Sequence, residues 1–133
     1  MSTANGAAKS IGDASRETGL SIDTLRYYER CGLICRVQRD SGGRRRYTDL
    51  DIAWFGFLRR LRATGLSVRA MRKFARLQQQ GRQTLEERLH ILQSHREGLA
   101  SRIGELSQML AYIDEKIDDY EQALRADRDR RGE

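Results

Sequence analysis

The stretch SIGDASRETGLSIDTLRYYERCGL, residues 10–33, decides how this chain folds. A serine followed three residues later by an aspartate is a helix-capping pattern, and it predicts a short helix over about residues 10–18 that Gly19 ends. A second serine cap predicts another helix over about residues 21–31, which the glycine of CGL stops. Two helices joined by a tight turn form a helix-turn-helix.

The next residues, GLICRVQRDSGGRRRYTD at 32–49, predict a two-stranded hairpin. A strand-like stretch, a Gly-Gly turn signal and an arginine-rich second strand follow one another in this order. Because alternate side chains of a strand face the same way, Arg44 and Arg46 share one face and Arg45 takes the other. A hairpin beside a helix-turn-helix is a wing.

Two further helices are expected after the hairpin. Thr48 and Asp51 form a capping-box pattern, and apolar residues then recur at helical spacing until Gly65. Ser67 begins a fourth helix that runs to about Leu77. No proline occurs in the chain, so caps and glycines alone set these boundaries.

From Thr84 onward, apolar residues recur in alternating steps of four and three, which is the heptad pattern of a coiled coil. Thr84 and Glu87 form a capping box that predicts the start of this long helix. Only Arg96 interrupts the pattern. Such a seam needs a partner, and we expect a second copy of the chain; the alternative is a solitary charged helix lying on its own domain. The seam consists of Leu85, Leu89, Leu92, Leu99, Ile103, Leu106, Leu110, Ile113, Ile117, Tyr120 and Leu124.

Positive charge is concentrated in the first part of the chain. Among 133 residues, 25 are Lys or Arg and 19 are Asp or Glu, a net charge of +6. Residues 1–83 hold 17 of these cations and 7 of the acids, a net charge of +10, whereas residues 84–133 have a net charge of −4. A strongly basic half favours an acidic partner such as nucleic acid.

The sequence also excludes several classes of protein. No stretch approaches the ~18 apolar residues of a membrane span, and the first residues lack the apolar run of a signal peptide, so we expect a cytoplasmic protein without membrane contact. There is no glycine-rich phosphate loop, no cluster of catalytic carboxylates and no metal-ligand constellation. We therefore expect no enzyme activity, no metal and no cofactor.

The second expected helix concentrates hydroxyl, guanidinium and phenol groups, which are the groups that reach phosphates and base edges in a major groove. The alternative is a solvated helix in which Glu29 pairs with a neighbouring arginine. The three wing arginines are interpreted as an anion-binding group rather than a solvated surface, because cations gathered at a hairpin tip repel one another unless an anion is bound. The helix residues concerned are Thr24, Arg26, Tyr27, Tyr28 and Arg30.

Taken together, these segments resemble the N-terminal DNA-binding domain of MerR-family transcription regulators over about residues 9–77. The resemblance rests on Leu-Arg-Tyr-Tyr-Glu at 25–29, on the Arg45-x-Tyr47 end of the wing and on Gly-Leu-Ser at 65–67. It implies a mainly α fold, in which a winged helix-turn-helix domain precedes a long dimerisation helix. That helix would form an antiparallel coiled coil with its two-fold mate.

The composition of the two ends, together with the family resemblance, divides the chain into four expected parts. Residues 1–8 would be a disordered lead-in, residues 9–82 the DNA-binding domain, residues 83–126 the coiled-coil dimerisation helix and residues 127–133 a polar tail.

The resemblance also implies roles for single residues. Arg26 and Tyr27 would read the major groove, and Thr24 would contact phosphate. Arg45 would hold the DNA backbone at the minor-groove side, while Tyr47 would pack the wing onto the domain. Additional charge or phosphate contacts would come from Arg44, Arg46, Ser15, Arg16, Arg62 and Ser67. Tyr28 would be partly buried, and the residues better placed in the core are Leu20, Leu25, Leu33, Leu50, Trp54, Phe57, Leu61 and Phe74.

The number and position of the cysteines bear on the signal that such a regulator senses. Metal-responsive members carry cysteines at and after the dimerisation helix, and this sequence has none beyond residue 35. It is similar to the short members, some of which respond to aldehydes or other electrophiles through a thiol. Cys31 and Cys35 are therefore candidate regulatory thiols, although we favour small, partly buried structural cysteines. His90 and His95 are five residues apart and cannot hold a metal on one helix face.

The family implies a homodimer on a two-fold operator that lies between the two promoter elements. The spacer between these elements is too long for RNA polymerase to engage both. Distortion of the DNA would activate or repress transcription in response to a small molecule or electrophile. The expected partners are double-stranded operator DNA, a second copy of the chain and RNA polymerase. The alternative is an architectural or recombination accessory protein without an effector, and a promoter-reporter assay separates the two.

Overall fold

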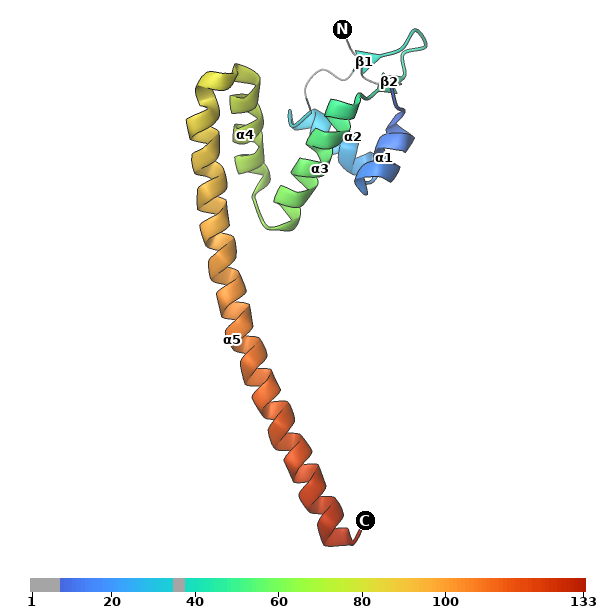
Figure 1. Cartoon of the computed structure of the whole chain (residues 1–133). Helices are drawn as coiled ribbons and strands as arrows, with labels where there is room; N and C mark the ends of the chain where they lie inside the picture. The colour runs from blue at the N-terminus through green and yellow to red at the C-terminus, as the bar shows by residue number, and fades with distance from the viewer. Residues whose placement is uncertain (1–7, 35–37) are drawn as a thin grey trace. The chain divides into compact units, whose positions relative to one another are not determined.

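The computed structural model describes residues 8–34 and 38–133, and the chain divides into two compact units, residues 1–93 and 94–133. Within the first unit, Figure 1 shows short helices with a small hairpin beside them; the second unit is helical. All but the last residue of the expected lead-in 1–8 falls outside the described residues, and so does Cys35. The mainly helical fold class expected from the sequence is confirmed.

Helices α1 (Ile11–Thr18) and α2 (Ile22–Arg30) form the predicted helix-turn-helix. Ser10 caps α1 in a full capping box with Asp13, and the left-handed residue Gly19 ends it at φ 77°, a conformation that favours glycine. The Ser21 side chain accepts a hydrogen bond from the backbone amide of Thr24 and caps α2. Local capping chemistry therefore fixes both helix starts, as the sequence predicted.

Strands β1 (Gln38–Arg39) and β2 (Arg45–Arg46) pair antiparallel, with Gln38 opposite Arg46 and Arg39 opposite Arg45. The predicted hairpin is confirmed, although each strand is only two residues long. Its base is held by Tyr47, which forms an isolated bridge with Lys9 ahead of α1. Tyr47 is also buried and meets Phe55 edge to face, as expected for a residue that packs the wing onto the domain.

Helices α3 (Asp49–Ala63) and α4 (Val68–Gln80) complete the first unit. Both α1 and α4 contact α3, so α3 is the central helix of the unit (Figure 1). The buried core includes the expected residues Leu25, Leu33, Leu61 and Phe74, and also Tyr28, Phe55, Leu58 and Met71. Leu20, Trp54 and Phe57 are partly buried against it.

The expectation that Leu50 is a core residue is wrong, because its side chain is 79% exposed. Leu50 lies in the first turn of α3, where the helix has just begun and none of the described elements covers it. Together with Leu33, Ile34 and Trp54 it borders an open cavity of about 230 Å³. Leu50 lies four residues before Trp54 and so shares its helix face. Sequence spacing identifies that face, but it does not show how far along the helix the neighbouring elements extend.

A short 3-10 turn η1 (Arg82–Thr84) leads into α5 (Leu85–Arg131). The helix begins one residue after Thr84, but the expected capping hydroxyl is used differently. The Thr84 hydroxyl donates to the carbonyls of Leu77 and Gly81 at 2.6 and 2.8 Å, which ties η1 back to the end of α4. The helix continues to Arg131, so most of residues 127–133, which were expected to form a polar tail, are helical. None of the helices described is long and apolar enough to cross a membrane.

Candidate nucleic-acid interface

Helix α2 buries one face and presents the other. Leu25 and Tyr28 point into the core, whereas Arg26, Tyr27 and Arg30 are exposed. An exposed guanidinium group beside a phenol that is 44% exposed gives this face the donors that base edges and phosphates accept. Thr24, expected to contact phosphate, is half-buried at the helix start, where its hydroxyl accepts a hydrogen bond from Ser21 at 2.9 Å.

Tyr27 lies in an electrostatic environment that also includes α3 and α4. A hydrogen bond and a charge interaction with Cys31 raise the pKa of the Tyr27 hydroxyl, and the positive charges of Arg62 and Arg72 act in the opposite direction. Cys31 itself is a half-buried free thiol packed against the core.

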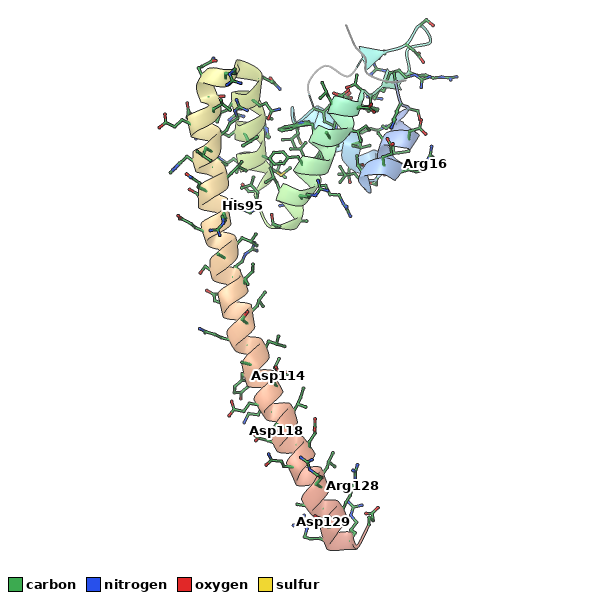
Figure 2. The ribbon with its side chains drawn as sticks, in the orientation of Figure 1. Arg16, His95, Asp114, Asp118, Arg128 and Asp129 are labelled. Atoms are coloured by element: carbon green, nitrogen blue, oxygen red, sulfur yellow. The ribbon has the colours of Figure 1, made fainter. Side chains whose placement is uncertain are left out.

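The α1 candidates differ in their availability. The Ser15 hydroxyl donates to the carbonyl of Leu20 at 2.6 Å, so it is occupied in the turn between the two helices. Arg16 is exposed on the surface of α1, where it pairs with Asp13 one turn earlier (Figure 2). An exposed pair of this kind is weak and can exchange its carboxylate for a phosphate.

Two of the three wing arginines bind carboxylates of the chain. Arg45 donates from Nε to both Glu29 oxygens, at 2.9 and 3.2 Å, and its Nη2 lies 2.8 Å from Glu29. This hydrogen bond is the main cause that raises the pKa of the Arg45 guanidinium. Arg46 pairs with Asp40 at 3.1 Å, while Arg44 is exposed at the tip. Arg44 is therefore the wing arginine most open to an incoming phosphate.

These contacts change two expectations about the interface. Glu29 does not serve a neighbouring arginine of its own helix; it pairs with the wing residue Arg45 instead. Arg45 was expected to hold the DNA backbone, but here its guanidinium is occupied by a carboxylate and is about three quarters buried. A phosphate contact by Arg45 would require this ion pair to open or to be shared.

The end of α3 and the turn into α4 carry Arg62 and Ser67, two of the expected DNA-contacting residues. Gly65 adopts φ 100°, a left-handed conformation that favours glycine. Arg62 is exposed and donates from Nη1 to the carbonyl of Leu66 at 3.4 Å. Ser67 accepts from the backbone amide of Ala70 and caps α4, so its side chain serves the helix start.

Sequence reasoning missed the basic face of α4. Its residues Arg69, Arg72, Lys73 and Arg76 are all exposed and lie within about 100° of arc on the helix. No Asp or Glu occurs between Val68 and Gln80, and that absence was the available signal. Against the larger raising effect of Cys31, Arg72 of this face slightly lowers the pKa of Tyr27 on α2.

The seam residues of α5 are apolar and largely exposed in the single chain. Leu92 is half-buried and packs against the core of the first unit, and Leu99 is also half-buried. Large exposed apolar side chains in a continuous row mark an interaction surface. The exposed members are Leu85, Leu89, Ile103, Leu106, Leu110, Ile113, Ile117, Tyr120 and Leu124.

No group of three or more His, Cys, Asp or Glu side chains that could hold a metal occurs in residues 8–34 and 38–133. The groups that this surface exposes are arginine side chains and the phenol ring of Tyr27.

This arrangement agrees with the family comparisons. Residues 9–78 match the profile described as MerR HTH family regulatory protein, and residues 52–116 match the one described as MerR, DNA binding. The chain belongs to the MerR family. Like its family relatives, it is a DNA-binding transcription regulator.

Two relatives show how far the similarity to MerR-family proteins extends. An uncharacterized HTH-type transcriptional regulator of Haemophilus influenzae is 36% identical over 110 residues, which is 83% of this chain and 82% of that protein. The HTH-type transcriptional regulator AdhR of Bacillus subtilis is 40% identical over 89 residues, 67% of this chain and 64% of AdhR.

Solved MerR-family structures are similar in three dimensions. A MerR family transcriptional regulator from Listeria monocytogenes has a TM-score of 0.81 at 39% identity, covering 85% of this chain and 86% of that one. HiNmlR, described as a MerR family regulator lacking the sensor domain and bound to promoter DNA, has a TM-score of 0.79 at 33% identity. That similarity covers 88% of this chain and 93% of HiNmlR.

Proposed function

We propose that this MerR-family regulator is a cytoplasmic homodimer that binds a two-fold operator in a promoter spacer and distorts the DNA to control transcription by RNA polymerase. The observation that carries the proposal is the exposed face of α2, where Arg26 and Tyr27 lie open beside a wing that presents Arg44. The similarity to HiNmlR, which was crystallised on promoter DNA, supports it.

The contacts at this surface fall into two classes. Arg26 and Tyr27 are the candidates for base readout, since guanidinium groups bind guanine edges bidentately. Arg16, Arg44, Arg62 and Arg72 are exposed and are the candidates for phosphate contacts, which position the protein without reading sequence. The remaining candidates make contacts within the chain and would hold the DNA-contacting residues in position. They are Thr24, Arg45, Arg46, Ser15 and Ser67.

Residues 9–82 are the proposed DNA-binding domain and residues 83–126 the proposed dimerisation helix. The exposed apolar seam supports homodimerisation, because a soluble chain rarely leaves such a row uncovered. Bending or untwisting a promoter spacer costs on the order of a few kcal/mol, and phosphate contacts from both half-sites can supply it. We propose a small molecule or an electrophile as the signal that changes the distortion.

Binding of the DNA upstream of the protein's own gene, compared with random DNA of equal length, tests the proposal. Arg26→Ala should weaken operator binding and reduce the preference for operator over random DNA, by about 1–3 kcal/mol of discrimination. Arg44→Ala and Arg72→Ala should each weaken binding to operator and to random DNA equally. Each should also reduce the salt dependence of the affinity by the amount expected for about one phosphate contact.

Arg125→Ala on α5 is the matched control, because this exposed arginine lies outside the proposed DNA-binding domain. If Arg26→Ala weakened operator and random DNA equally, Arg26 would be a phosphate contact and the recognition-helix assignment would be wrong. A reporter fused to the same promoter distinguishes a regulator from an architectural protein, because only the regulator changes the reporter output when it is deleted and restored.

A further inference from the structure

Arg96 is the one charged residue at a seam position of α5, between Leu92 and Leu99, and its side chain is exposed. In a parallel coiled coil, each seam position lies against the same position of the partner. A parallel pair would therefore place two Arg96 guanidinium groups in one apolar layer. Like charges in a desolvated layer are strongly unfavourable.

The other charges of α5 also oppose a parallel pair. Residues 85–104 contain three Lys or Arg and three Asp or Glu, a net charge of zero, whereas residues 105–124 contain one against six, a net charge of −5. Parallel pairing would place the two acidic segments side by side. Antiparallel pairing places each acidic segment beside the neutral one. The centres of the two acidic segments then lie about 20 residues, or roughly 30 Å, apart along the helix axis, which is several Debye lengths.

One antiparallel register uses the whole seam. The seam alternates between two positions of the heptad, a and d. In an antiparallel pair, an a residue of one helix packs against a d residue of the partner, whereas in a parallel pair each packs against its own kind. When Ile103 faces the partner's Leu106, every one of the twelve seam positions from 85 to 124 faces another seam position. A shift by one heptad in either direction leaves two positions at one end without a seam partner.

In this register Arg96 faces the partner's Ile113 and lies beside the residue that follows it, the partner's Asp114. Asp114 flanks the seam, and Figure 2 shows it on the C-terminal part of α5. A long arginine side chain can bury its methylene groups in the apolar layer and extend its guanidinium group to the edge. The Asp114 carboxylate is the acceptor at that edge.

We propose that Arg96 of each protomer pairs with Asp114 of its partner, and that this symmetric pair of ion pairs fixes the antiparallel register of the dimer. The proposal rests on the homodimer of the proposed function. It adds which residues of the two protomers are in contact. It also gives Arg96, the residue that breaks the apolar pattern, a role in setting the antiparallel direction of the two helices.

Disulfide trapping tests the register in the full-length chain carrying Cys31→Ser and Cys35→Ser. In the proposed register Leu99 faces the partner's Leu110, so Leu99→Cys combined with Leu110→Cys should give a covalent dimer under mild oxidation. Each single cysteine variant should stay uncrosslinked, because residue 99 is then 11 residues from residue 99 of the partner along the seam. Crosslinking of the single variants would show a parallel pair and would overturn the proposal.

Charge exchange tests the ion pair. Arg96→Glu and Asp114→Arg should each weaken dimerisation by about tenfold in sedimentation equilibrium, because each places like charges together. The combination Arg96→Glu with Asp114→Arg should recover most of the loss. Glu115→Arg, a charge reversal one residue away on the outer helix face, is the matched control and should leave the dimer unchanged.

The outcomes separate this proposal from the one on which it rests. A parent chain that sediments as a monomer would contradict the homodimer itself. A dimeric parent in which the Leu99 and Leu110 double variant does not crosslink, or in which the exchanged charges do not recover dimerisation, would leave the homodimer standing and overturn the register and the ion pair.

Discussion

Glu29 connects α2 to the wing. Its carboxylate binds Arg45, sixteen residues later, and both side chains are about three quarters buried. The sequence places Glu29 within reach of arginines in its own helix, which is why an ion pair within α2 was a reasonable alternative. Tertiary packing decides otherwise, because buried Tyr47 holds β2 against the domain and brings Arg45 to the carboxylate. The direction of the wing is thus set partly by α2.

A double-mutant cycle with Glu29→Gln and Arg45→Gln should give a coupling free energy of about 1 kcal/mol in urea unfolding at fixed protein concentration. The pair is partly shielded from water, so it should exceed a fully exposed ion pair. The same cycle on Asp13 and Arg16, an exposed pair within α1, is the comparison and should give a smaller value. Equal coupling for both cycles would show that the Glu29–Arg45 pair adds no more stability than an exposed ion pair does.

At the scale of the secondary-structure elements, the hairpin has little regular structure of its own. Each strand has two residues, so the turn must be held by side chains. Asp40 does this: one carboxylate oxygen accepts from the amides of Gly42 and Arg44 at 2.9 and 3.0 Å, and the other binds Arg46. The backbone hydrogen bond from Arg44, followed by the smaller effects of Arg46 and Gly42, lowers the pKa of Asp40 below its ordinary value.

The lowered pKa predicts how the wing responds to pH. Because the folded-state pKa of Asp40 lies below the unfolded value of about 3.9, its stabilising contribution is complete above that value and is lost as the pH falls through the folded pKa. An NMR titration of the Asp40 carboxyl carbon should therefore have a midpoint below that of a free aspartate.

Near neutral pH, Asp40→Asn should speed hydrogen exchange of the Gly42 and Arg44 amides. Asp23→Asn on the exposed start of α2 should leave these two amides unchanged. An ordinary titration midpoint for Asp40 would contradict its role in holding the turn.

The elements that could be predicted are those fixed by local chemistry. The serine and threonine caps and the glycine ends placed α1 to α4 within a few residues, since each signal acts on its own neighbours in the chain. The sequence pattern predicted that the Thr84 hydroxyl caps α5, whereas it donates to the carbonyls of Leu77 and Gly81. Sequence spacing does not show which of several possible partners a hydroxyl binds. Leu50 and the α4 arginines show the same limit, because exposure depends on where neighbouring elements end.

At the scale of the whole molecule, the two units have different sources of stability. Residues up to 93 enclose a core with fully buried side chains such as Leu25, Phe55 and Met71. Residues 94–133 form no buried core in the single chain, and their apolar seam remains largely exposed. A long helix with an uncovered seam gains most of its stability from packing against a partner rather than from helix propensity. The second unit is therefore the part of the chain whose folding should depend on protein concentration.

Leu106→Asp tests this dependence. The substitution places a carboxylate in the apolar layer near the centre of the proposed dimer, and an unpaired charge buried there costs several kcal/mol. Sedimentation should show a monomer, and circular dichroism should show less helix, because residues 94–133 lose their packing partner while the first unit keeps its own core. Gln108→Asp adds the same charge at an outward heptad position and is the matched control, so it should stay dimeric. A Leu106→Asp chain that remained a dimer with full helix content would mean that the copies meet through another surface, and the heptad pattern of α5 would then need a different partner to cover it.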